Sequence, residues 1–386
     1  MKKVCVLTSA HPAKDARIFY KEARSLAQAG YKVVLIAQAP AGRLSSVPGE
    51  ETADGVRLLY FPPVSNRWQR LLNVRALYTL ARDQEADIYH FHDPDLIPVG
   101  LALQKNLGRP VIYDIHEYYS DSLKTRHWVP APLRRPIAAI FDRYEKRAAR
   151  RLAGVVTVNA HMAEQFAAVN PRGIVLHNYA LQNQFAGPFP TEESFKGVPR
   201  ILYLGSINRE RGLEVILEAM PRVVERFPQA TCTLVGPVDP GGLDERYLPL
   251  DPWLERGHIR LTGAVPYEEV PAIMARSTLA LVPLLPTLNY QKAIPVKLIE
   301  YMAAGLPVVG SRFGHIERIV EETGCGQLAL PGDAEDLAAV IGTLLADPAQ
   351  AWQCAQRGRK AFRECYSWES EEPKLLAFYR DLLAQT

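Results

Sequence analysis

Hydrophobic positions along the chain form two series of short apolar runs, and longer amphipathic segments separate the runs. The runs of the first series lie at residues 4–9, 32–37, 56–61, 87–92, 111–116, 154–159 and 173–178. Short β-branched runs between helical patterns are typical of βαβ units, whose parallel sheet is covered by helices on both faces. The first half of the chain therefore predicts a Rossmann-like domain.

A second series of the same kind predicts a second domain. Its runs lie at residues 200–205, 230–236, 258–263, 279–284, 306–311 and 326–330. Between the two series, residues 179–199 are rich in Pro, Gly, Glu and Ser and lack an apolar period, which is typical of a linker. The chain of 386 residues is also too long for one ordinary core.

The predicted fold class is therefore α/β, with two doubly wound Rossmann-like domains facing across a cleft. The predicted segments are an N-terminal domain at 1–180, a linker at 181–199, a second domain at 200–365 and a C-terminal helix at 366–386 that packs on the N-terminal domain. In such sheets, ligands bind outside the carboxyl ends of the strands. The cleft between these ends is the expected site.

The composition excludes several other classes of protein. Hydrophobic residues make up 48% of the chain and charged residues 23%, as in soluble globular proteins. The net charge of +3 is too small to indicate nucleic acid as a partner. No apolar run is long enough for a membrane span or a signal peptide. The five cysteines are scattered without a Cys-x-x-Cys pair, which favours the cytoplasm and argues against a zinc site.

A loop in the second series has the residue types of a phosphate site. In YLGSINRERGLEV, a strand ends at Gly205, a polar loop carries Arg209 and Arg211, and Gly212 opens a helix. Guanidinium groups and free backbone N–H groups bind phosphate in this arrangement. The alternative is a solvated turn with surface arginines.

A carboxylate in the run NYQKAIPVKLIEYMAAGLPVVG needs an explanation. Pro295 and Gly305 predict the start and end of a short helix, and Glu300 lies inside it. If a nucleoside diphosphate bound between Gly205 and the start of this helix, Glu300 could accept hydrogen bonds from both ribose hydroxyls. The alternative is a structural ion pair with Lys297, three residues earlier on the same face.

Two segments of the first series carry further candidates. His116 follows the strand at 111–115, at the end where reacting groups gather, although it could also be a capping or core histidine. Asp15 and Arg17 lie in or beside the first loop, where they could contact an acceptor or cap the following helix.

The run HFHDPD at residues 90–95 has the residue types of a metal site. Asp93 and Asp95 form an Asp-x-Asp, which in other sugar-transferring enzymes holds a divalent metal, and His90 and His92 precede them. Loops with two carboxylates are common at strand ends, however. We therefore expect no metal here.

A predicted helix at residues 133–154 is strongly basic. Its cationic residues are Arg134, Arg135, Arg143, Lys146, Arg147, Arg150 and Arg151. They face only two acids, so the helix is a candidate for contact with an anionic membrane surface, with Trp128 as an interfacial anchor. A solvated basic helix is the alternative.

Together these motifs resemble the GT-B glycosyltransferases of the retaining family four, over nearly the whole chain. The segments that carry the resemblance include HFHDPDLIPVG, YDIHEYY, YLGSINRERGLEVILEAM and PVKLIEYMAAGLPVVGS. The resemblance implies transfer of a sugar from a UDP- or GDP-linked donor to an acceptor hydroxyl, with retention, without a metal and without a cofactor. It implies that His116 helps to align the reaction at the donor sugar, that Glu300 holds the ribose and that Arg211 binds phosphate.

The sequence departs from the family pattern in the donor site. Lys292 stands at the first glutamate of the family's Glu-x7-Glu motif, Ala293-Ile294-Pro295 replaces its Gly-Phe-Gly, and Ser206 replaces the arginine of the phosphate loop. A bacterial branch of the family has such a Pro-x-Lys-x-x-Glu-Tyr variant. The expected donor contacts are Gly205, Ser206, Arg209, Arg211, Lys292, Ala293, Ile294 and Glu300.

The resemblance also implies a partner and a place in the cell. The acceptor would be a glycan or a lipid-linked sugar of bacterial polysaccharide, lipopolysaccharide or glycolipid assembly, contacted by Asp15, Arg17 and Asp93. The protein would be cytoplasmic, either free or peripheral on the inner face of the plasma membrane. The alternative functions are a nucleotide-sugar 2-epimerase of the same fold and a non-catalytic nucleotide-sugar binding protein.

Overall fold

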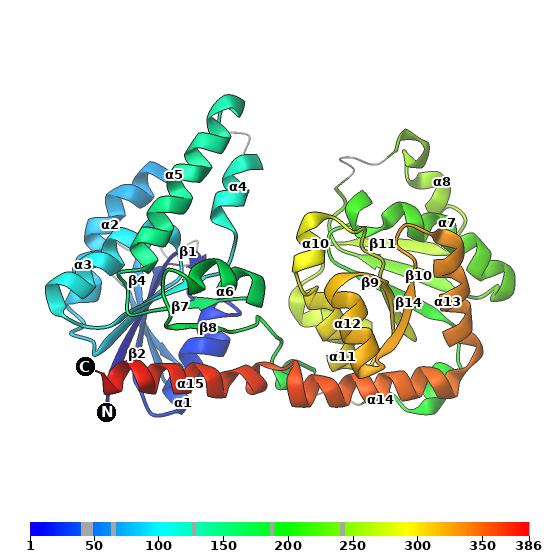
Figure 1. Ribbon diagram of the computed structural model, residues 1–386. Helices are drawn as coiled ribbons and strands as arrows, with labels where there is room; N and C mark the ends of the chain where they lie inside the picture. Colours follow the sequence, from blue (N-terminus) through cyan, green and yellow to red (C-terminus); the bar gives the residue numbers. More distant parts are fainter. Residues whose placement is uncertain (40–48, 63–66, 126–128, 186–188, 240–243, 386) are drawn as a thin grey trace. The chain divides into compact units, whose positions relative to one another are not determined.

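The chain divides into two compact units in the computed structural model (Figure 1). Unit 1 comprises Met1–Asn178 with Glu371–Thr386, and unit 2 comprises Tyr179–Ser370. The structure describes residues 1–39, 49–62, 67–125, 129–185, 189–239 and 244–385.

Unit 1 is built on an eight-stranded sheet in the order β3-β4-β2-β1-β5-β6-β7-β8. Its strands are β1 (Lys3–Pro12), β2 (Lys32–Gln38), β3 (Glu50–Ala53), β4 (Val56–Phe61), β5 (Ile88–Phe91), β6 (Val111–Ile115), β7 (Gly154–Thr157) and β8 (Gly173–Val175). All neighbouring strands pair in parallel except β3, which pairs with β4 in an antiparallel hairpin. β5 and β6 are completely buried, and β2 is buried from Val33 to Ala37, which explains their continuous apolar runs.

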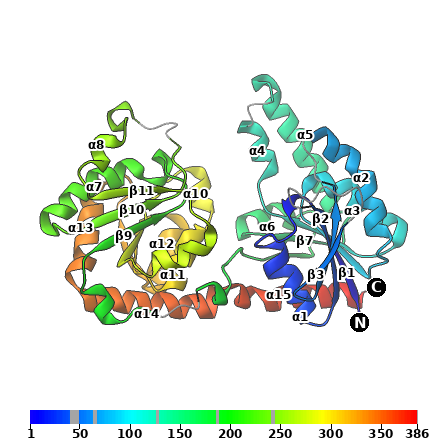
Figure 2. The same ribbon diagram turned by 180° about the vertical axis from the view of Figure 1, so that it is seen from behind.

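Helices lie on both faces of this sheet (Figures 1 and 2). They are η1 (Ile18–Ala23), α1 (Arg24–Gln28), α2 (Arg67–Arg82), η2 (Pro94–Leu96), α3 (Ile97–Leu107), α4 (Tyr119–Thr125), α5 (Ala131–Ala149), α6 (Ala160–Ala167) and α15 (Trp368–Ala384). From Glu371 onward α15 belongs to unit 1, where Leu375 and Tyr379 are fully buried.

Unit 2 has a six-stranded, all-parallel sheet in the order β11-β10-β9-β12-β13-β14. The strands are β9 (Arg200–Leu204), β10 (Thr231–Val235), β11 (Ile259–Gly263), β12 (Leu279–Val282), β13 (Val308–Ser311) and β14 (Gly326–Ala329). The longer helices are α7 (Leu213–Arg226), α11 (Val296–Ala304), α12 (Gly314–Thr323), α13 (Ala334–Ala346) and α14 (Pro348–Cys365). The short ones are η3 (Gln182–Phe185), η4 (Glu192–Phe195), η5 (Arg209–Arg211), η6 (Glu245–Tyr247), α8 (Asp251–Leu254), η7 (Tyr267–Glu269), α9 (Val270–Met274) and α10 (Leu288–Lys292).

Both sheets reverse their strand order next to the first strand of the unit. In unit 1 β1 lies between β2 and β5, and in unit 2 β9 lies between β10 and β12. The connections on the two sides of this strand run in opposite directions, so its carboxyl end opens into a crevice. The loops after β1, β5 and β9 are therefore where each unit offers a binding site.

Two segments differ from the sequence expectations. Residues 181–199, expected to form a linker, belong to unit 2, where η3 and η4 each bury a phenylalanine, Phe185 and Phe195. Isolated aromatic anchors give no apolar period, so a periodicity criterion does not find them. β3, with the polar sequence EETA, was not expected as a strand because it forms an edge without a continuous apolar run. Within the described part of the chain, no helix is long and apolar enough to cross a membrane.

Candidate functional site

Asp93, which follows β5, fixes the carboxyl-terminal end of β1. Its Oδ2 accepts hydrogen bonds from Thr8 Oγ1 at 2.7 Å, from the Ser9 amide at 2.7 Å and from the Ala10 amide at 3.2 Å. The other carboxylate oxygen lies 3.6 Å from His11 Nε2. Asp93 is buried, so the role it has in this structure is to join two strand ends.

Asp15 and Arg17 also make contacts inside unit 1. Asp15 Oδ1 accepts hydrogen bonds from the amides of Arg17 and Ile18 at 2.8 and 3.0 Å, which caps the start of η1. The Arg17 side chain is 4% exposed, and its Nη1 donates to the Leu176 carbonyl at 2.9 Å. Arg17 therefore has almost no surface with which to meet an acceptor.

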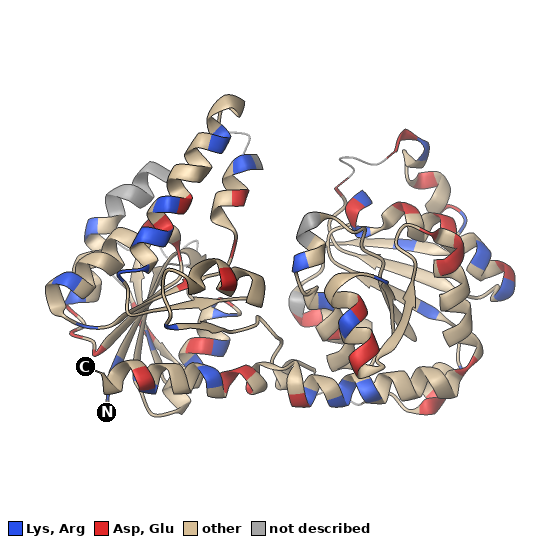
Figure 3. Cartoon of the chain, in the orientation of Figure 1, with Lys and Arg blue, Asp and Glu red and all other residues tan. Residues whose placement is uncertain are grey.

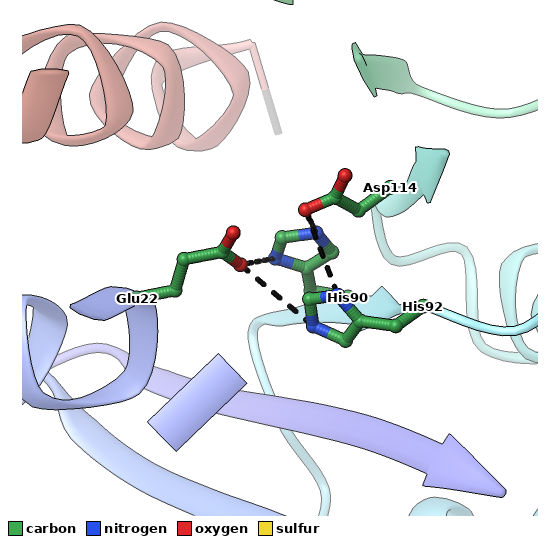
Figure 4. A group of neighbouring side chains, drawn as sticks. All are labelled: Glu22, His90, His92 and Asp114. Carbon is green, nitrogen blue, oxygen red and sulfur yellow. Dashed lines mark ion pairs between the residues drawn. The ribbon is translucent and has the colours of Figure 1, made fainter. Parts of the chain in front are cut away.

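Arg17 is part of a buried polar network that also contains Glu22, His90, His92 and Asp114. Figure 4 shows the last four of these side chains. The Arg17 guanidinium lies 2.8 Å from Glu22 Oε1 and 2.9 Å from Asp114 Oδ2. The two imidazole rings stack with their centroids 4.5 Å apart. Each ring approaches both carboxylates, at N–O distances between 3.5 and 3.9 Å.

Burial decides which members of this network carry charge. It raises the pKa of Glu22 well above its usual value, and the neighbouring Asp114 acts in the same direction. Burial would also raise the pKa of Asp114, but Arg17, His116 and His92 together outweigh it and hold that pKa well below its usual value. Burial lowers the pKa of both histidines, that of His92 to about 4. These directions favour the charged forms of Arg17 and Asp114 and the neutral forms of Glu22, His90 and His92.

Four members of the network have the chemistry of metal ligands. Glu22, His90, His92 and Asp114 each offer a ligand atom, and these atoms lie within 4.8 Å of one another. Arg17 already pairs with both carboxylates, so a metal ion would have to displace a guanidinium that neutralises the site. In this arrangement, the residues are better suited to share protons around the Arg17–Asp114 ion pair than to bind a metal ion.

His116 connects this network to the surface. It directly follows β6, and its Nε2 lies 3.1 Å from His92 Nδ1 and 3.3 Å from Asp114 Oδ2. An ionised carboxylate next to Nε2 favours the tautomer that carries its proton there. The side chain is 12% exposed, whereas those of His92 and Asp114 are fully buried. The network therefore holds one imidazole in a fixed orientation at the strand ends.

A cavity of about 410 Å³ lies beside the turn after β1. Its polar lining residues are His11, Lys14, Gln38, Glu51 and Tyr60. Lys14 Nζ lies 2.9 Å from Glu51 Oε1, and the Tyr60 hydroxyl donates to Glu51 Oε2 at 3.0 Å. Such a set of donors and acceptors suits a ligand rich in hydroxyl groups.

In unit 2, the loop after β9 has the shape that the sequence predicts for a phosphate site. Gly205 has a φ of 111°, and Gly212, at the start of α7, has a φ of 84°, both unfavourable for residues with a Cβ. A Cβ at Gly212 would also overlap the Pro283 carbonyl. Of the two loop arginines, Arg209 is about half exposed and pairs with Glu214 at 3.5 Å. Arg211 instead lies against Gly205.

Arg211 and Lys297 form a cation pair at Gly205. A Cβ at Gly205 would lie 3.2 Å from both Arg211 Nη1 and Lys297 Nζ. Arg211 Nε donates to the Tyr290 hydroxyl at 3.0 Å, and Lys297 Nζ lies 3.7 Å from the centre of the Tyr203 ring. Because Gly205 has no side chain, the point between the two cations is left open.

The helix that carries Glu300 is the one that the sequence predicts. Pro295 precedes α11 as its N-cap, and Gly305 ends it in the left-handed conformation. Glu300 is partly exposed, one turn after Lys297. Glu300 raises the pKa of Lys297 less than Arg211 lowers it, so the alternative reading of Glu300 as a structural partner of Lys297 does not describe the dominant interaction of that lysine.

The remaining predicted donor residues lie around these elements. The Ser206 carbonyl accepts a hydrogen bond from the Tyr203 hydroxyl at 2.8 Å. Lys292 and Ala293 are exposed at the end of α10, and Ile294 is partly buried. These positions are compatible with donor contacts, which remain predictions.

Sequence reasoning missed four residues of the two clusters. Glu22, Asp114 and Tyr379 belong to the buried network region, where the Tyr379 hydroxyl lies 2.7 Å from His90 Nδ1, and Lys297 belongs to the cation pair. A charged residue inside a buried strand, such as Asp114 in VIYDI, was a signal that could have been used. Nothing in the local sequence links Tyr379 to His90.

The two parallel α/β sheets define a GT-B fold, as comparisons with solved structures show. Sucrose-phosphate synthase from Thermosynechococcus elongatus superimposes with a TM-score of 0.70 at 19% identity, over 100% of both chains. The Anabaena protein HepE, solved in complex with UDP, superimposes with a TM-score of 0.69 at 15% identity, over 99% of this chain and 100% of that one.

The sequence places the chain in a family. Residues 16–178 match the family described as Glycosyltransferase Family 4, and residues 198–347 match Glycosyl transferases group 1. A glycogen synthase of Mycobacterium tuberculosis is 24% identical over 90% of this chain and 86% of its own length. An MMP alpha-(1->4)-mannosyltransferase of Mycolicibacterium hassiacum is 26% identical over 82% and 76%. The two matches together span most of the chain, which therefore belongs to the glycosyltransferases that these two family models describe.

Proposed function

We propose that the protein is a retaining glycosyltransferase that needs no metal and takes a UDP- or GDP-linked sugar as donor. The observation that carries the proposal is the arrangement after β9, where Gly205, Arg211 and the helix that bears Glu300 come together. Cations beside an unobstructed strand end suit a diphosphate. Structures of HepE with UDP and with UDP-glucose support a nucleotide sugar as the ligand of this fold.

In the proposed reaction, cationic side chains stabilise the leaving group. Arg211 would bind the diphosphate and offset the charge that develops when the bond from the anomeric carbon to the diphosphate oxygen breaks. The acceptor oxygen would form its bond on the same face of the sugar, and its proton would pass to the departing diphosphate oxygen. Glu300 would accept hydrogen bonds from the ribose hydroxyls and hold the nucleotide in register.

His116 is the proposed catalytic residue of unit 1. Asp114 and His92 hold its Nε2 at 3.3 and 3.1 Å, so its orientation is set before any ligand binds. We assign it a hydrogen bond to the transferred sugar. The neighbouring cavity lined by His11, Lys14, Gln38, Glu51 and Tyr60 is the place that we propose for the acceptor.

The proposed biological role is the assembly of bacterial cell-surface polysaccharide, lipopolysaccharide or glycolipid. Helix α5 supports a lipid-linked acceptor, because its exposed apolar residues fall on one stripe at Leu133, Ile137, Ile140 and Tyr144. The same helix carries exposed arginines at 135, 143 and 147, and Figure 3 shows basic residues along it. Apolar and cationic side chains together suit an anionic membrane surface. Trp128, the expected anchor, lies outside the described residues.

The test of the enzymatic proposal is slow hydrolysis of the donor in the absence of an acceptor. The protein would be incubated with a panel of UDP- and GDP-sugars, and the release of UDP or GDP measured. Hydrolysis of at least one donor is expected, with strong loss in Glu300→Ala and in His116→Ala. NMR of the released sugar reports the anomeric configuration, and the α form from an α-linked donor is expected.

Other outcomes would support other functions. A donor epimerised at C2 in the NMR spectrum would indicate the 2-epimerase. Tight binding of a nucleotide sugar without turnover under any acceptor would indicate a binding protein. Activity that is lost with EDTA and restored by a divalent cation would contradict metal independence.

The membrane contact has its own test. Co-sedimentation with vesicles of phosphatidylglycerol and phosphatidylcholine should exceed that with phosphatidylcholine alone, because the basic face of α5 attracts anionic lipid. Ile140→Glu should abolish it. Equal binding to both kinds of vesicle would remove α5 from the proposal.

A further inference from the structure

Lys297 is a buried lysine with an unusual environment. The residue is 8% exposed, and its Nζ has no hydrogen-bond partner among the described residues. An ammonium group that gives up water without gaining a hydrogen bond or counter-charge is costly. The nearest cationic neighbour, Arg211, adds repulsion, because both groups approach the same point beside Gly205. This arrangement therefore destabilises the folded protein when no ligand is bound.

The repulsion is not offset within unit 2. Burial lowers the pKa of Lys297 well below its usual value, and Arg211 lowers it further, while Glu300 raises it by less. The groups that face the amine are Arg211 of η5, Glu300 of α11 and the aromatic ring of Tyr203 on β9. The ammonium form of Lys297 is therefore disfavoured in the protein without a ligand, next to a permanent cation.

An anion at Gly205 would relieve this cost. It would interact with both cations at once, and Gly205 leaves the approach open because it lacks a side chain. The described neighbours in the loop do not supply this negative charge. Ser206 is uncharged, and Arg209 is itself a cation, paired with Glu214. A single phosphate or a diphosphate has the size and charge to fill this position.

We propose that Lys297 is a second phosphate-binding cation, which holds the diphosphate of the donor together with Arg211 and takes up a proton as the diphosphate binds. The inference rests on the proposed function and adds to it a residue of α11 that the phosphate loop itself does not provide. The proton comes from solvent and forms the ammonium group. The lysine side chain is flexible enough to move its Nζ from the face of Tyr203 to the anion.

The test is isothermal titration of the full chain with UDP, GDP and inorganic pyrophosphate, in two buffers of different ionisation enthalpy at the same pH. The difference between the buffers gives the number of protons taken up. The variants are Lys297→Met, Lys297→Arg and the matched control Lys360→Met, which removes an exposed lysine of α14 in the same unit. Circular dichroism and thermal unfolding verify that each variant is folded.

The expected results separate the cation from a structural role. Wild type and Lys360→Met should bind UDP or GDP with uptake of a proton, and Lys297→Met should bind at least tenfold more weakly without it. Lys297→Arg should keep most of the affinity but take up no proton, because a guanidinium is always charged. A merely structural lysine would not produce this split.

Three results would contradict the inference on Lys297, the proposed function or both, and they can be distinguished from one another. If wild type binds a nucleotide and Lys297→Met binds it equally well, the inference on Lys297 fails and the proposed function stands. If only pyrophosphate binds, and through Lys297, the anion site stands and the nucleotide-sugar function fails. If wild type binds none of the three ligands, both fail.

Discussion

The buried polar network of unit 1 and the cation pair of unit 2 both bury charge at the carboxyl end of a central strand, but they balance it differently. In the network, Arg17 pairs with Glu22 and Asp114, so the charges cancel within the unit. In the cation pair, Lys297 is repelled by Arg211 more than it is attracted by Glu300. The network is therefore complete without a ligand, and the cation pair is not.

This difference gives a physical criterion for separating structural from ligand-binding polar clusters. The network has the residue types of a metal site, yet it already contains its cation. In the cation pair, Lys297 belongs to no common ligand motif, yet the charge of the pair is left uncompensated. Uncompensated buried charge, more than residue type, indicates which polar cluster binds a ligand.

The largest predicted effect comes from removing the cation of the network. Arg17→Met should lower the free energy of unfolding by about 3–5 kcal/mol, because it leaves the buried Asp114 carboxylate without a counter-charge. Urea unfolding measures this change, and hydrogen exchange of β5 and β6 locates it in unit 1.

Two variants control this experiment. Arg82→Met removes an exposed arginine, paired at the surface with Asp83, and should change stability by less than about 0.5 kcal/mol. Arg17→Lys keeps the charge but loses the two-pronged geometry, so an intermediate loss is expected. If Arg17→Met were as stable as wild type, the network would not be neutralised by Arg17.

A smaller effect distinguishes the two carboxylates of the network. The pKa of Asp114 is held well below its usual value and that of Glu22 well above it. We therefore expect Asp114→Asn to remove a charge from the pair with Arg17, and Glu22→Gln to replace one neutral group with another. Asp114→Asn should cost at least about 2 kcal/mol more than Glu22→Gln. Paired urea titrations at pH 7 measure the difference. Equal costs would mean that the two acids share the charge.

Much of the fold could be predicted because buried parallel strands leave continuous apolar runs. The runs at 32–37 and 56–61 correspond to β2 (Lys32–Gln38) and β4 (Val56–Phe61) almost residue for residue. β3 could not be predicted in this way, since only pairing with β4 makes EETA a strand. Residues 181–199 were misread for a similar reason: their anchors are single aromatic residues.

The candidate site could be predicted where it is local in sequence. Helix α11 with Glu300 and the loop with Arg211 carry their own proline, glycine and arginine signals. The partners of Arg17 could not be predicted, because Asp114 reaches it only through the pairing of distant strands. Lys297 was considered only as a partner of Glu300, since helical spacing shows neighbours on one helix and not the β9 loop that packs against it.

The cation pair predicts a change of opposite sign. Lys297→Met should raise the free energy of unfolding by about 1–2 kcal/mol near pH 7, because it removes a buried amine without a hydrogen bond. The unfolded lysine binds a proton up to its usual pKa of 10.5, and the folded one releases it at lower pH. The unfolded state thus binds more protons, so wild-type stability rises with pH in this window.

The advantage of Lys297→Met should therefore shrink as the pH approaches 10.5. Urea unfolding at pH 7 and pH 10 tests this, with Lys360→Met as the control that should resemble wild type at both. A destabilised Lys297→Met would mean that the amine has a structural partner. The cation pair would then be compensated within unit 2, as the network is within unit 1.

The smallest predicted effect concerns an exposed cation near the pair. Lys292, at the end of α10, is exposed, so its charge is screened by salt in a way that a buried charge is not. Lys292→Glu should leave stability within about 0.5 kcal/mol of wild type and weaken UDP or GDP binding by about 1 kcal/mol at low salt. At 1 M salt, where the screening length is about 3 Å, this loss should vanish, whereas the loss in Lys297→Met should persist. Titrations at both salt concentrations measure the two effects side by side. A loss of affinity in Lys292→Glu that persists at high salt would indicate direct contact between Lys292 and the donor. An unchanged affinity and donor preference would show that Lys292 does not take part in donor recognition.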